Sequence, residues 1–218
     1  MILVNFKTYP QGTGNLSLKL VEICQKIQKT SGVKIIPVVQ TVDLRQATQK
    51  FPDLEIWIQH LDWQPAGQWT GWVNLEAAAE AGASGTLLNH SEHPLPPGTV
   101  NQVIKRVKDF KVMVCCRTIG QATRLAKFKP DFLAYEPPEL IGNKEKSVAT
   151  EKPKAIKKIA SFIKPIPLIV GAGINSREDV KTGLKMGACG ILVSSGVVLS
   201  EEPEKVLSDF ASAFGDSK

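Results

Sequence analysis

The sequence lacks features that several classes of protein require. Its 218 residues include only four cysteines, and neither a C-x-x-C pair nor a nearby histidine gives them the spacing of zinc ligands. We therefore expect no disulfide framework, no metal site, and reduced buried thiols at Cys24, Cys115, Cys116 and Cys189. No apolar run approaches the roughly 20 residues of a membrane span, and the apolar start at residues 1–4 is too short for a signal peptide. These absences predict a cytoplasmic protein that does not contact membranes.

Concentrated positive charge is also missing, although the formal net charge is +6. The lysines are spread along the chain as on solvated helix faces, for example at Lys154, Lys157 and Lys158 and again at Lys181 and Lys185. A protein that binds nucleic acid would gather such charge in a stripe with stacking aromatic side chains, and the sequence contains no such stripe. The charge therefore predicts no nucleic-acid partner and supports at most a mild attraction for anionic metabolites.

Eight short apolar runs recur along the chain, with an average spacing of about 27 residues that fits a strand, a loop and a helix of three turns. The runs cover residues 2–6, 34–39, 55–59, 85–88, 112–116, 132–135, 167–170 and 190–193. Helical spacing lies between them, most clearly over 16–27 and 180–187, and Ser176 suits a helix N-cap. Strands that alternate with helices predict an α/β protein with a parallel sheet, and eight units favour one (β/α)8 barrel domain spanning 1–218. A doubly wound open sheet is the structural alternative.

Polar side chains follow several of these predicted strands. Glu136 comes directly after the run 131–135, Asn5 and Lys7 end the first run, and His90 follows the fourth. Because the carboxyl ends of barrel strands carry the active site, we expect these groups to meet at one mouth of the barrel. The strand period of two predicts that Asn5 and Lys7 point the same way. Glu136 alone would more often be a solvated loop residue, so its interpretation depends on the other groups.

Separated motifs occur in order at these strand ends. They are Val4-Asn5-Phe6-Lys7, Leu88-Asn89-His90-Ser91-Glu92, Tyr135-Glu136-Pro137-Pro138-Glu139-Leu140-Ile141-Gly142, Gly171-Ala172-Gly173-Ile174 and Ser194-Ser195-Gly196. Each motif is weak by itself, but their combination is specific. Through them, over essentially its whole length, the chain resembles the triosephosphate isomerase family in its compact archaeal form.

The resemblance implies an enzyme of glycolysis and gluconeogenesis that interconverts dihydroxyacetone phosphate and D-glyceraldehyde 3-phosphate through an enediolate, without cofactor or metal. Glu136 is expected to move a proton between adjacent carbons as the base. His90 is expected to act as a neutral electrophile, the standard assignment for this family, which is carried over here with the resemblance. Lys7 is expected to stabilise the phosphate and the oxyanion. Glu92 is expected beside Lys7 and His90 as an auxiliary or orienting acid, and Ser91-Glu92 suits a short helical start.

The same resemblance implies a phosphate-binding site and a lid that closes over the substrate. Substrate contacts are expected from Asn5, Phe6, Lys7, Ile141, Gly142, Gly173, Ser194, Ser195 and Gly196. The loops after the seventh and eighth strands commonly form such a phosphate site in barrels. The lid is expected from Pro137 to about Ala149. The family usually continues Gly-Thr-Gly at its tip, whereas Gly142 is followed here by Asn143 and Lys144, so we expect altered lid mobility.

A second surface is expected at Gln59-His60-Leu61-Asp62 and Trp69-Thr70-Gly71, which look like the family's subunit-contact loop. The resemblance therefore implies a homodimer or homotetramer. Trp57, Trp63, Trp69 and Trp72 crowd this region, which suits either the edge of a core or a contact between subunits.

Two other classes of function remain open. One is a catalytically idle barrel that binds a phosphometabolite, although such a barrel is expected to have lost Glu136 or His90. The other is a different phosphate-binding barrel enzyme. A Schiff-base aldolase needs a buried lysine at a strand end, for which Lys7 is the only strong candidate. A metal-dependent epimerase needs several His and Asp ligands, and His60 and His93 lack suitable partners. The isomerase is therefore the preferred hypothesis.

Overall fold

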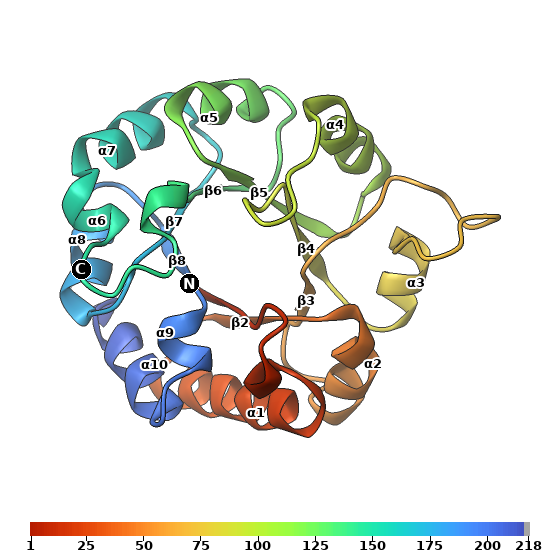
Figure 1. Ribbon diagram of the computed structural model, residues 1–218, viewed down its shortest axis with the longest axis horizontal. Coiled ribbons are helices and arrows are strands. Elements are labelled where there is room, and N and C mark those ends of the chain that lie inside the picture. Colours follow the sequence, from red (N-terminus) through yellow and green to blue (C-terminus); the bar gives the residue numbers. More distant parts are fainter. Residues whose placement is uncertain (216–218) are drawn as a thin grey trace.

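The structure, a computed structural model, describes residues 1–215 as a closed barrel of eight parallel strands surrounded by helices (Figure 1). The strands are β1 Ile2–Asn5, β2 Ile35–Val39, β3 Trp57–Ile58, β4 Gly85–Leu88, β5 Lys111–Cys116, β6 Phe132–Tyr135, β7 Leu168–Gly171 and β8 Gly190–Val193. Each pairs with the next, and β8 pairs with β1, so the open-sheet alternative is excluded. The predicted (β/α)8 barrel is thus confirmed, while residues 216–218 of the predicted domain lie outside the described residues.

The helices form a ring around the strands (Figure 1). They are α1 Gly14–Ser31, α2 Thr41–Lys50, α3 Leu75–Glu80, α4 Pro97–Arg106, α5 Ile119–Ala126, α6 Val148–Glu151, α7 Pro153–Phe162, α8 Arg177–Lys185, α9 Ser195–Val198 and α10 Pro203–Ser212, with 3-10 turns η1 Pro10–Gly12 and η2 Pro138–Leu140. Ser176 is the N-cap of α8, as predicted, and its side chain accepts from the amide of Asp179. Gly187 follows the end of α8 with a φ of 103°, which glycine adopts readily.

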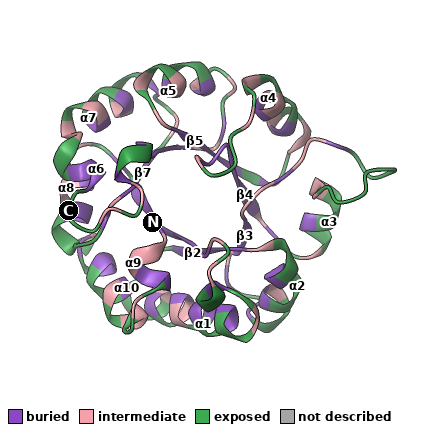
Figure 2. Cartoon of the chain, viewed as in Figure 1, coloured by how far each residue is buried: buried purple, intermediate pink, exposed green. Residues whose placement is uncertain are grey.

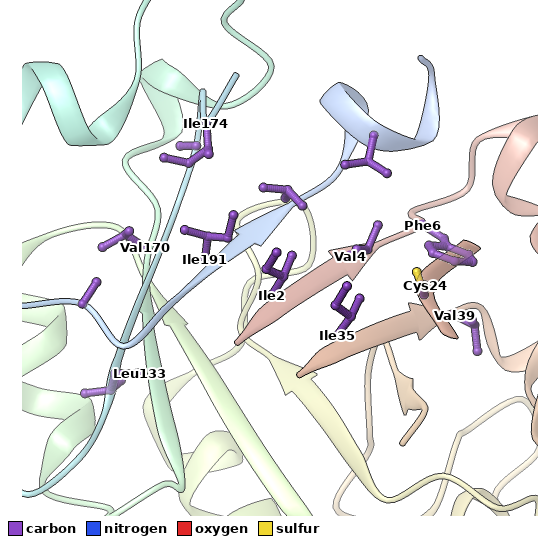
Figure 3. Close-up of a cluster of buried hydrophobic side chains, with 14 of the residues drawn as sticks. Ile2, Val4, Phe6, Cys24, Ile35, Val39, Leu133, Val170, Ile174 and Ile191 are labelled. Carbon is purple, nitrogen blue, oxygen red and sulfur yellow. The ribbon is translucent and has the colours of Figure 1, made fainter. Parts of the chain in front are cut away.

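Alternate side chains of the strands enter two separate cores, as the strand period of two requires. Leu3 faces the barrel interior with Trp57 and Ile169. Ile2 and Val4, its neighbours, face outward and pack in the layer between strands and helices (Figure 3). Buried residues accordingly form the barrel wall and the inner faces of the helices, while the outer faces of the helices are exposed (Figure 2). The barrel is therefore a filled scaffold whose loops are free to carry the site.

The cysteine prediction is confirmed for three thiols and wrong for the fourth. All four cysteines are free, and Cys24, Cys115 and Cys116 are buried, but Cys189 is exposed. Cys189 directly precedes β8, and its amide donates to the carbonyl oxygen of Leu168 at the start of β7. It therefore lies at the amino-terminal rim of the barrel, where the chain enters the sheet from solvent.

The segment after β3 extends away from the barrel before α3 begins (Figure 1). Two hydrogen bonds between Asp62 and Val73 close the base of this segment. The Asp62 amide donates to the Val73 carbonyl oxygen, and the Val73 amide donates to the Asp62 side chain. The four tryptophans of this region have different environments. Trp57 is fully buried in the barrel, whereas Trp69 and Trp72 are 41% and 51% exposed on the projecting loop.

No helix within residues 1–215 is long and apolar enough to cross a membrane.

Candidate active site

A cavity opens to solvent at the carboxyl ends of the strands, with about 470 Å³ of empty space including its open mouth. Five loops supply its lining, namely those after β1, β4, β6, β7 and β8. The lining residues are Asn5, Lys7, His90, Glu136, Ile141, Gly142, Asn143, Ala172, Gly173, Ile174, Asn175, Leu192, Val193, Ser194, Ser195 and Gly196. Most of the residues expected from the sequence therefore meet around one space, as the placement of strand ends in a parallel barrel requires.

Lys7 and Asn5 both reach this cavity, but not by strand alternation alone. β1 ends at Asn5, and Lys7 has a φ of 46°, in the left-handed region that a non-glycine residue rarely adopts. The Asn5 side chain supports this turn, because its Oδ1 accepts from the Lys7 amide at 3.0 Å. The carbonyl oxygen of Lys7 in turn accepts from Nε2 of Gln59 at 3.0 Å. A buried amide side chain and a neighbouring loop thus fix the strained turn that carries the cation.

Phe6 is not brought to the cavity. It is fully buried in the layer between strands and helices, with Ile2 and Val4 (Figure 3). The reason is the same period of two that directs Asn5 inward, because adjacent residues of an extended strand face opposite sides. The expected role of Phe6 as a substrate contact is therefore corrected to that of a core residue.

The ammonium group of Lys7 is held by Glu92, which also lies beside His90. Lys7 Nζ is 2.6 Å from Glu92 Oε1, and Nδ1 of His90 is 3.6 Å from Glu92 Oε2. The side chain of Glu92 is about half exposed, so its ion pair with Lys7 is screened by solvent and of modest strength. The expected grouping of these three residues is present. The segment after His90 is a turn, however, since the next helix, α4, begins only at Pro97.

Hydrogen bonding defines the tautomer of His90. Its Nδ1 accepts from the backbone amide of Glu92 at 3.2 Å, so this nitrogen carries no proton. The remaining proton is on Nε2, which lies 3.7 Å from Oε2 of Glu136 on the cavity side. The turn that follows His90 therefore favours the tautomer with its proton on Nε2, directed into the site.

We expect an NMR spectrum of the free protein near neutral pH to show this tautomer directly. With ¹⁵N-labelled histidine, Nδ1 of His90 should resonate as an unprotonated acceptor and Nε2 as a protonated nitrogen, because the Glu92 amide occupies Nδ1. A His90→Gln variant assigns the signals. A spectrum in which both nitrogens of His90 carry protons would contradict the assignment.

Glu136 is a buried carboxylate at the end of β6. It is 5% exposed, and its backbone amide donates to the carbonyl oxygen of Cys116 at 2.9 Å. Its Oε2 is buried and has no hydrogen-bond partner among residues 1–215. Burial of an unpaired carboxylate oxygen is costly, and such groups cluster at functional sites. This orphaned oxygen faces His90 and leaves Glu136 free to receive a proton from a molecule in the cavity.

The cysteines next to Glu136 are not reactive groups. Burial raises the pKa of the Cys115 thiol well above its ordinary value, and the nearby Glu136 carboxylate raises it further. Burial, again with Glu136, raises the pKa of Cys116 to about 12. Both sulfurs therefore stay protonated and serve as packing groups beneath the carboxylate.

The turns after β7 and β8 form a cradle of small residues. Gly173 has a φ of 67°, and a side chain there would collide with the carbonyl oxygen of Lys146. Ser195 begins the short helix α9, whose first amides have no acceptor within the helix. The Ser194 hydroxyl oxygen is buried and has no hydrogen-bond partner among the described residues. These donors around one space suit an anionic group such as a phosphate.

The segment from Pro137 to Ala149 covers one side of the cavity. Ile141, Gly142 and Asn143 all contribute to the lining. The side chain of Asn143 folds back into its own loop, where Oδ1 accepts from the amides of Glu145 and Lys146 at 2.9 Å. The tip residues 144–146 are exposed, as expected from their polarity. Lys144 therefore stands where the family lid has its second glycine, and the side chain of Asn143 shapes the tip.

Sequence reasoning missed two groups at this lid. Asp179 lies in the first turn of α8, where it is buried and accepts from the Ser147 hydroxyl at 2.5 Å. Asn175 was assigned no role, although its side chain donates to the carbonyl oxygen of Asn143 at 2.7 Å. The one available signal was the capping pattern at Ser176, which placed Asp179 at the base of the same loop.

A closed (β/α)8 barrel that presents a carboxylate, an imidazole and an ammonium group beside an anion cradle is typical of enzymes that act on small phosphorylated molecules. The family model described as triosephosphate isomerase matches residues 1–119 and 106–211 of the chain. The chain therefore belongs to the triosephosphate isomerase family.

Full-length relatives give the same result. The chain is 38% identical to the triosephosphate isomerase of Methanothermus fervidus over 215 residues, which are 96% of either chain. It is 39% identical to that of Saccharolobus solfataricus, with 96% of this chain and 94% of the relative covered. With that of Thermoplasma volcanium the identity is 37%, over 95% of this chain and 97% of the relative. The expected archaeal form of the family is thus confirmed by similarity along nearly the whole chain.

Proposed function

We propose that this barrel interconverts dihydroxyacetone phosphate and D-glyceraldehyde 3-phosphate, with Glu136 as the base that moves the proton between the two carbons. The observation that carries this proposal is the facing pair of Glu136 and His90. An unpaired carboxylate oxygen lies 3.7 Å from the Nε2 of a neutral imidazole at the cavity wall. A substrate in the cavity can contact both groups, a proton acceptor and a hydrogen-bond donor, which is what enolisation of a carbonyl compound requires.

In this mechanism Glu136 takes the proton from the carbon next to the carbonyl group, and electrons move onto the carbonyl oxygen. His90 donates its Nε2 proton in a hydrogen bond to that oxygen, and Lys7 adds a positive charge. Glu136 then returns the proton to the neighbouring carbon, which completes the exchange of carbonyl and hydroxyl groups. Glu92 acts through the others, because its amide fixes the tautomer of His90 and its carboxylate holds Lys7.

The phosphate is proposed to lie in the cradle after β7 and β8. Backbone donors at Gly173, Ser194 and Ser195 surround it, Gly196 allows close approach, and Gly142 contributes an amide from the lid. All five residues line the same cavity as Glu136. Ile141 supplies an apolar surface that excludes water from the carbanion-like intermediate.

A coupled assay tests this function. The purified chain is given glyceraldehyde 3-phosphate, and formation of dihydroxyacetone phosphate is followed through a second enzyme that consumes it. Conversion that rises in proportion to protein, with kcat on the order of 10 s⁻¹ or more, is expected for an enzyme with ordinary turnover. Binding of the substrate without conversion would instead identify the idle phosphometabolite-binding barrel.

We further propose that the chain works as one barrel domain in the cytoplasm, in glycolysis and gluconeogenesis, and assembles into a homodimer or homotetramer. The projecting loop at 59–74 supports the assembly, since it presents the exposed side chains of Trp69 and Trp72. Aromatic residues of this kind are enriched at protein interfaces. The base of the loop contacts the site, because Gln59 donates to the Lys7 carbonyl oxygen. A partner that orders the loop would therefore also steady Lys7.

Replacement of Thr70 by arginine is expected to weaken this assembly about 100-fold, because an unpaired charge buried at an interface costs about 3 kcal/mol. Thr70 is exposed at the tip of the loop, so the fold itself should tolerate the change. Light scattering measures the mass, and activity is assayed over the same concentrations. Thr30→Arg, at the exposed end of α1, is the matched control. A fully active monomeric wild-type chain at assay concentration would refute the proposed contact.

A further inference from the structure

The carboxyl-terminal end of the lid is joined firmly to the loop after β7. Asp179 is the anchor, because its Oδ1 accepts from the Ser147 hydroxyl while Oδ2 accepts from the amides of Asn175 and Ser176 at 3.1 and 3.0 Å. The amide of Val148 also donates to the carbonyl oxygen of Ala172 at 3.0 Å. These bonds are buried or partly buried, so the two segments form one rigid base. Motion of the lid therefore has to occur on the amino-terminal side of Ser147.

One side chain reaches from this base to the tip of the lid. Nδ2 of Asn175 donates to the carbonyl oxygen of Asn143 at 2.7 Å and to that of Gly173 at 2.9 Å. Both protons of the amide are thus used, one on the lid and one on the loop that forms the anion cradle. The Asn175 backbone is held by Asp179 and its side-chain amide by the Gly173 carbonyl oxygen, so the position of this amide has support that does not come from the lid.

The lid tip is shaped to present that carbonyl group. The Asn143 side chain accepts from the amides of Glu145 and Lys146, which fixes the turn around its own backbone. Gly142, directly before it, has a φ of 70°, in the region that favours glycine. The two residues thus turn the Asn143 carbonyl oxygen toward Asn175 and leave the neighbouring amide of Gly142 at the cavity.

We propose that Asn175 is a positioning residue that holds the lid closed over the bound substrate through the Asn143 carbonyl group. The inference rests on the proposed isomerase function, since its purpose is to keep the enediolate away from water. Asn175 acts through the lid and does not itself take part in the proton transfer. Its hydrogen bond to the lid is exposed, so it is weak enough to open again for product release.

Early opening has a definite chemical result. When the oxyanion of the enediolate is on C1, its electrons can form the C1 carbonyl while the double bond moves from C1–C2 to C2–C3. The C3–oxygen bond then breaks, and phosphate leaves with the bonding electron pair. The remaining enol aldehyde gains a proton on C3 and loses one from oxygen, which gives methylglyoxal. A lid that opens too soon therefore releases inorganic phosphate and methylglyoxal during turnover.

Two variants of Asn175 test the proposal, with Asn15→Ala on the exposed face of α1 as the matched control. Asn175→Ala removes the donor, and loss of one ordinary hydrogen bond should shift the closed population about fivefold. Asn175→Asp keeps the shape but places carboxylate oxygens against two carbonyl oxygens, so its effect should be larger. Both should lower kcat/KM and raise the phosphate released per turnover. Because Asn175 is exposed, Tm should stay within the range of the control.

Hydrogen exchange gives a measurement that does not depend on activity. With 2-phosphoglycolate bound as a phosphate-bearing carboxylate probe, amides of residues 139–146 should exchange about fivefold faster in Asn175→Ala than in the wild-type chain. Equal protection in both proteins would overturn the proposal, even if the wild-type chain is an active isomerase. A fall in Tm that accounts for the whole loss of protection would also overturn it, because Asn175 would then stabilise the loop and not the closed lid. A wild-type chain without isomerase activity refutes the proposed function, while the exchange result still decides the role of Asn175.

Discussion

Replacement of Glu136 by glutamine is expected to lower kcat by at least about 10³ while the barrel remains folded. The amide has nearly the shape of the carboxylate but cannot accept the proton, so both proton transfers lose their base. The carboxylate is buried, and its Oε2 has no partner among the described residues, so the substitution removes no hydrogen bond at that oxygen. Stability should be unchanged or slightly higher, because an unpaired buried charge is removed.

The measurement combines the coupled isomerase assay with circular dichroism and thermal unfolding. Glu22→Gln, an exposed carboxylate on α1, is the matched control and should keep wild-type turnover. Substrate affinity should change little, because the phosphate cradle is formed by other loops. Turnover close to that of the wild type, with unchanged folding, would remove Glu136 from the mechanism.

The barrel was predictable because its signal is periodic and repeated. Eight apolar runs of the right length predicted all eight strands, with ends that differ from the observed ones by at most two residues. The strand with the largest shift is β3, which is reduced to Trp57–Ile58 and leads into the projecting loop. A short strand next to a long loop carries little pattern, so its ends depend on pairing with β2 and β4.

Errors at the site arose where one residue belongs to two patterns. Phe6 lies between two residues of a family motif, and the motif alone made it a substrate contact. The period of two within β1 assigns it to the outer core, where the structure places it. Lys7 shows the opposite case, since it reaches the cavity through a left-handed backbone that strand periodicity does not describe. Such a conformation depends on Asn5 and on a distant loop residue, Gln59.

The lid anchor was not predictable for a related reason. Asp179 is 32 residues from Ser147 and Asn175 is 32 residues from Asn143, and no local pattern connects either pair. The capping motif at Ser176 explains two of the bonds that the Asp179 carboxylate accepts, from the amide and the hydroxyl of Ser176. The bond from Ser147 exists only because the barrel brings β6 and β7 together. Contacts of this kind are properties of the closed fold.

Replacement of Gly171 by alanine is expected to lower kcat by about 10², although Gly171 makes no contact with the substrate in the proposed mechanism. A methyl group on Gly171 would lie 2.7 Å from Oε1 and 2.9 Å from Cγ of Glu136, and 2.9 Å from the carbonyl oxygen of Leu192. The overlap with the Leu192 carbonyl oxygen requires a small shift of the strand backbone, while the flexible side chain of Glu136 gives way most and its carboxylate is displaced. A base displaced by about 1 Å loses its alignment with the reacting carbon.

Gly98→Ala on α4 is the matched control, since a methyl group there meets nothing within 4 Å. A double substitution separates displacement of the base from general damage to the barrel. If Gly171→Ala acts by moving the carboxylate, it should cost little further activity in a Glu136→Gln background, because the base is already lost. If the two losses multiply, the methyl group must disturb another part of the site, such as the cradle that begins at Gly173. Strong non-additivity, with a Tm close to that of Glu136→Gln alone, would show that the bare backbone of Gly171 exists to leave room for the base.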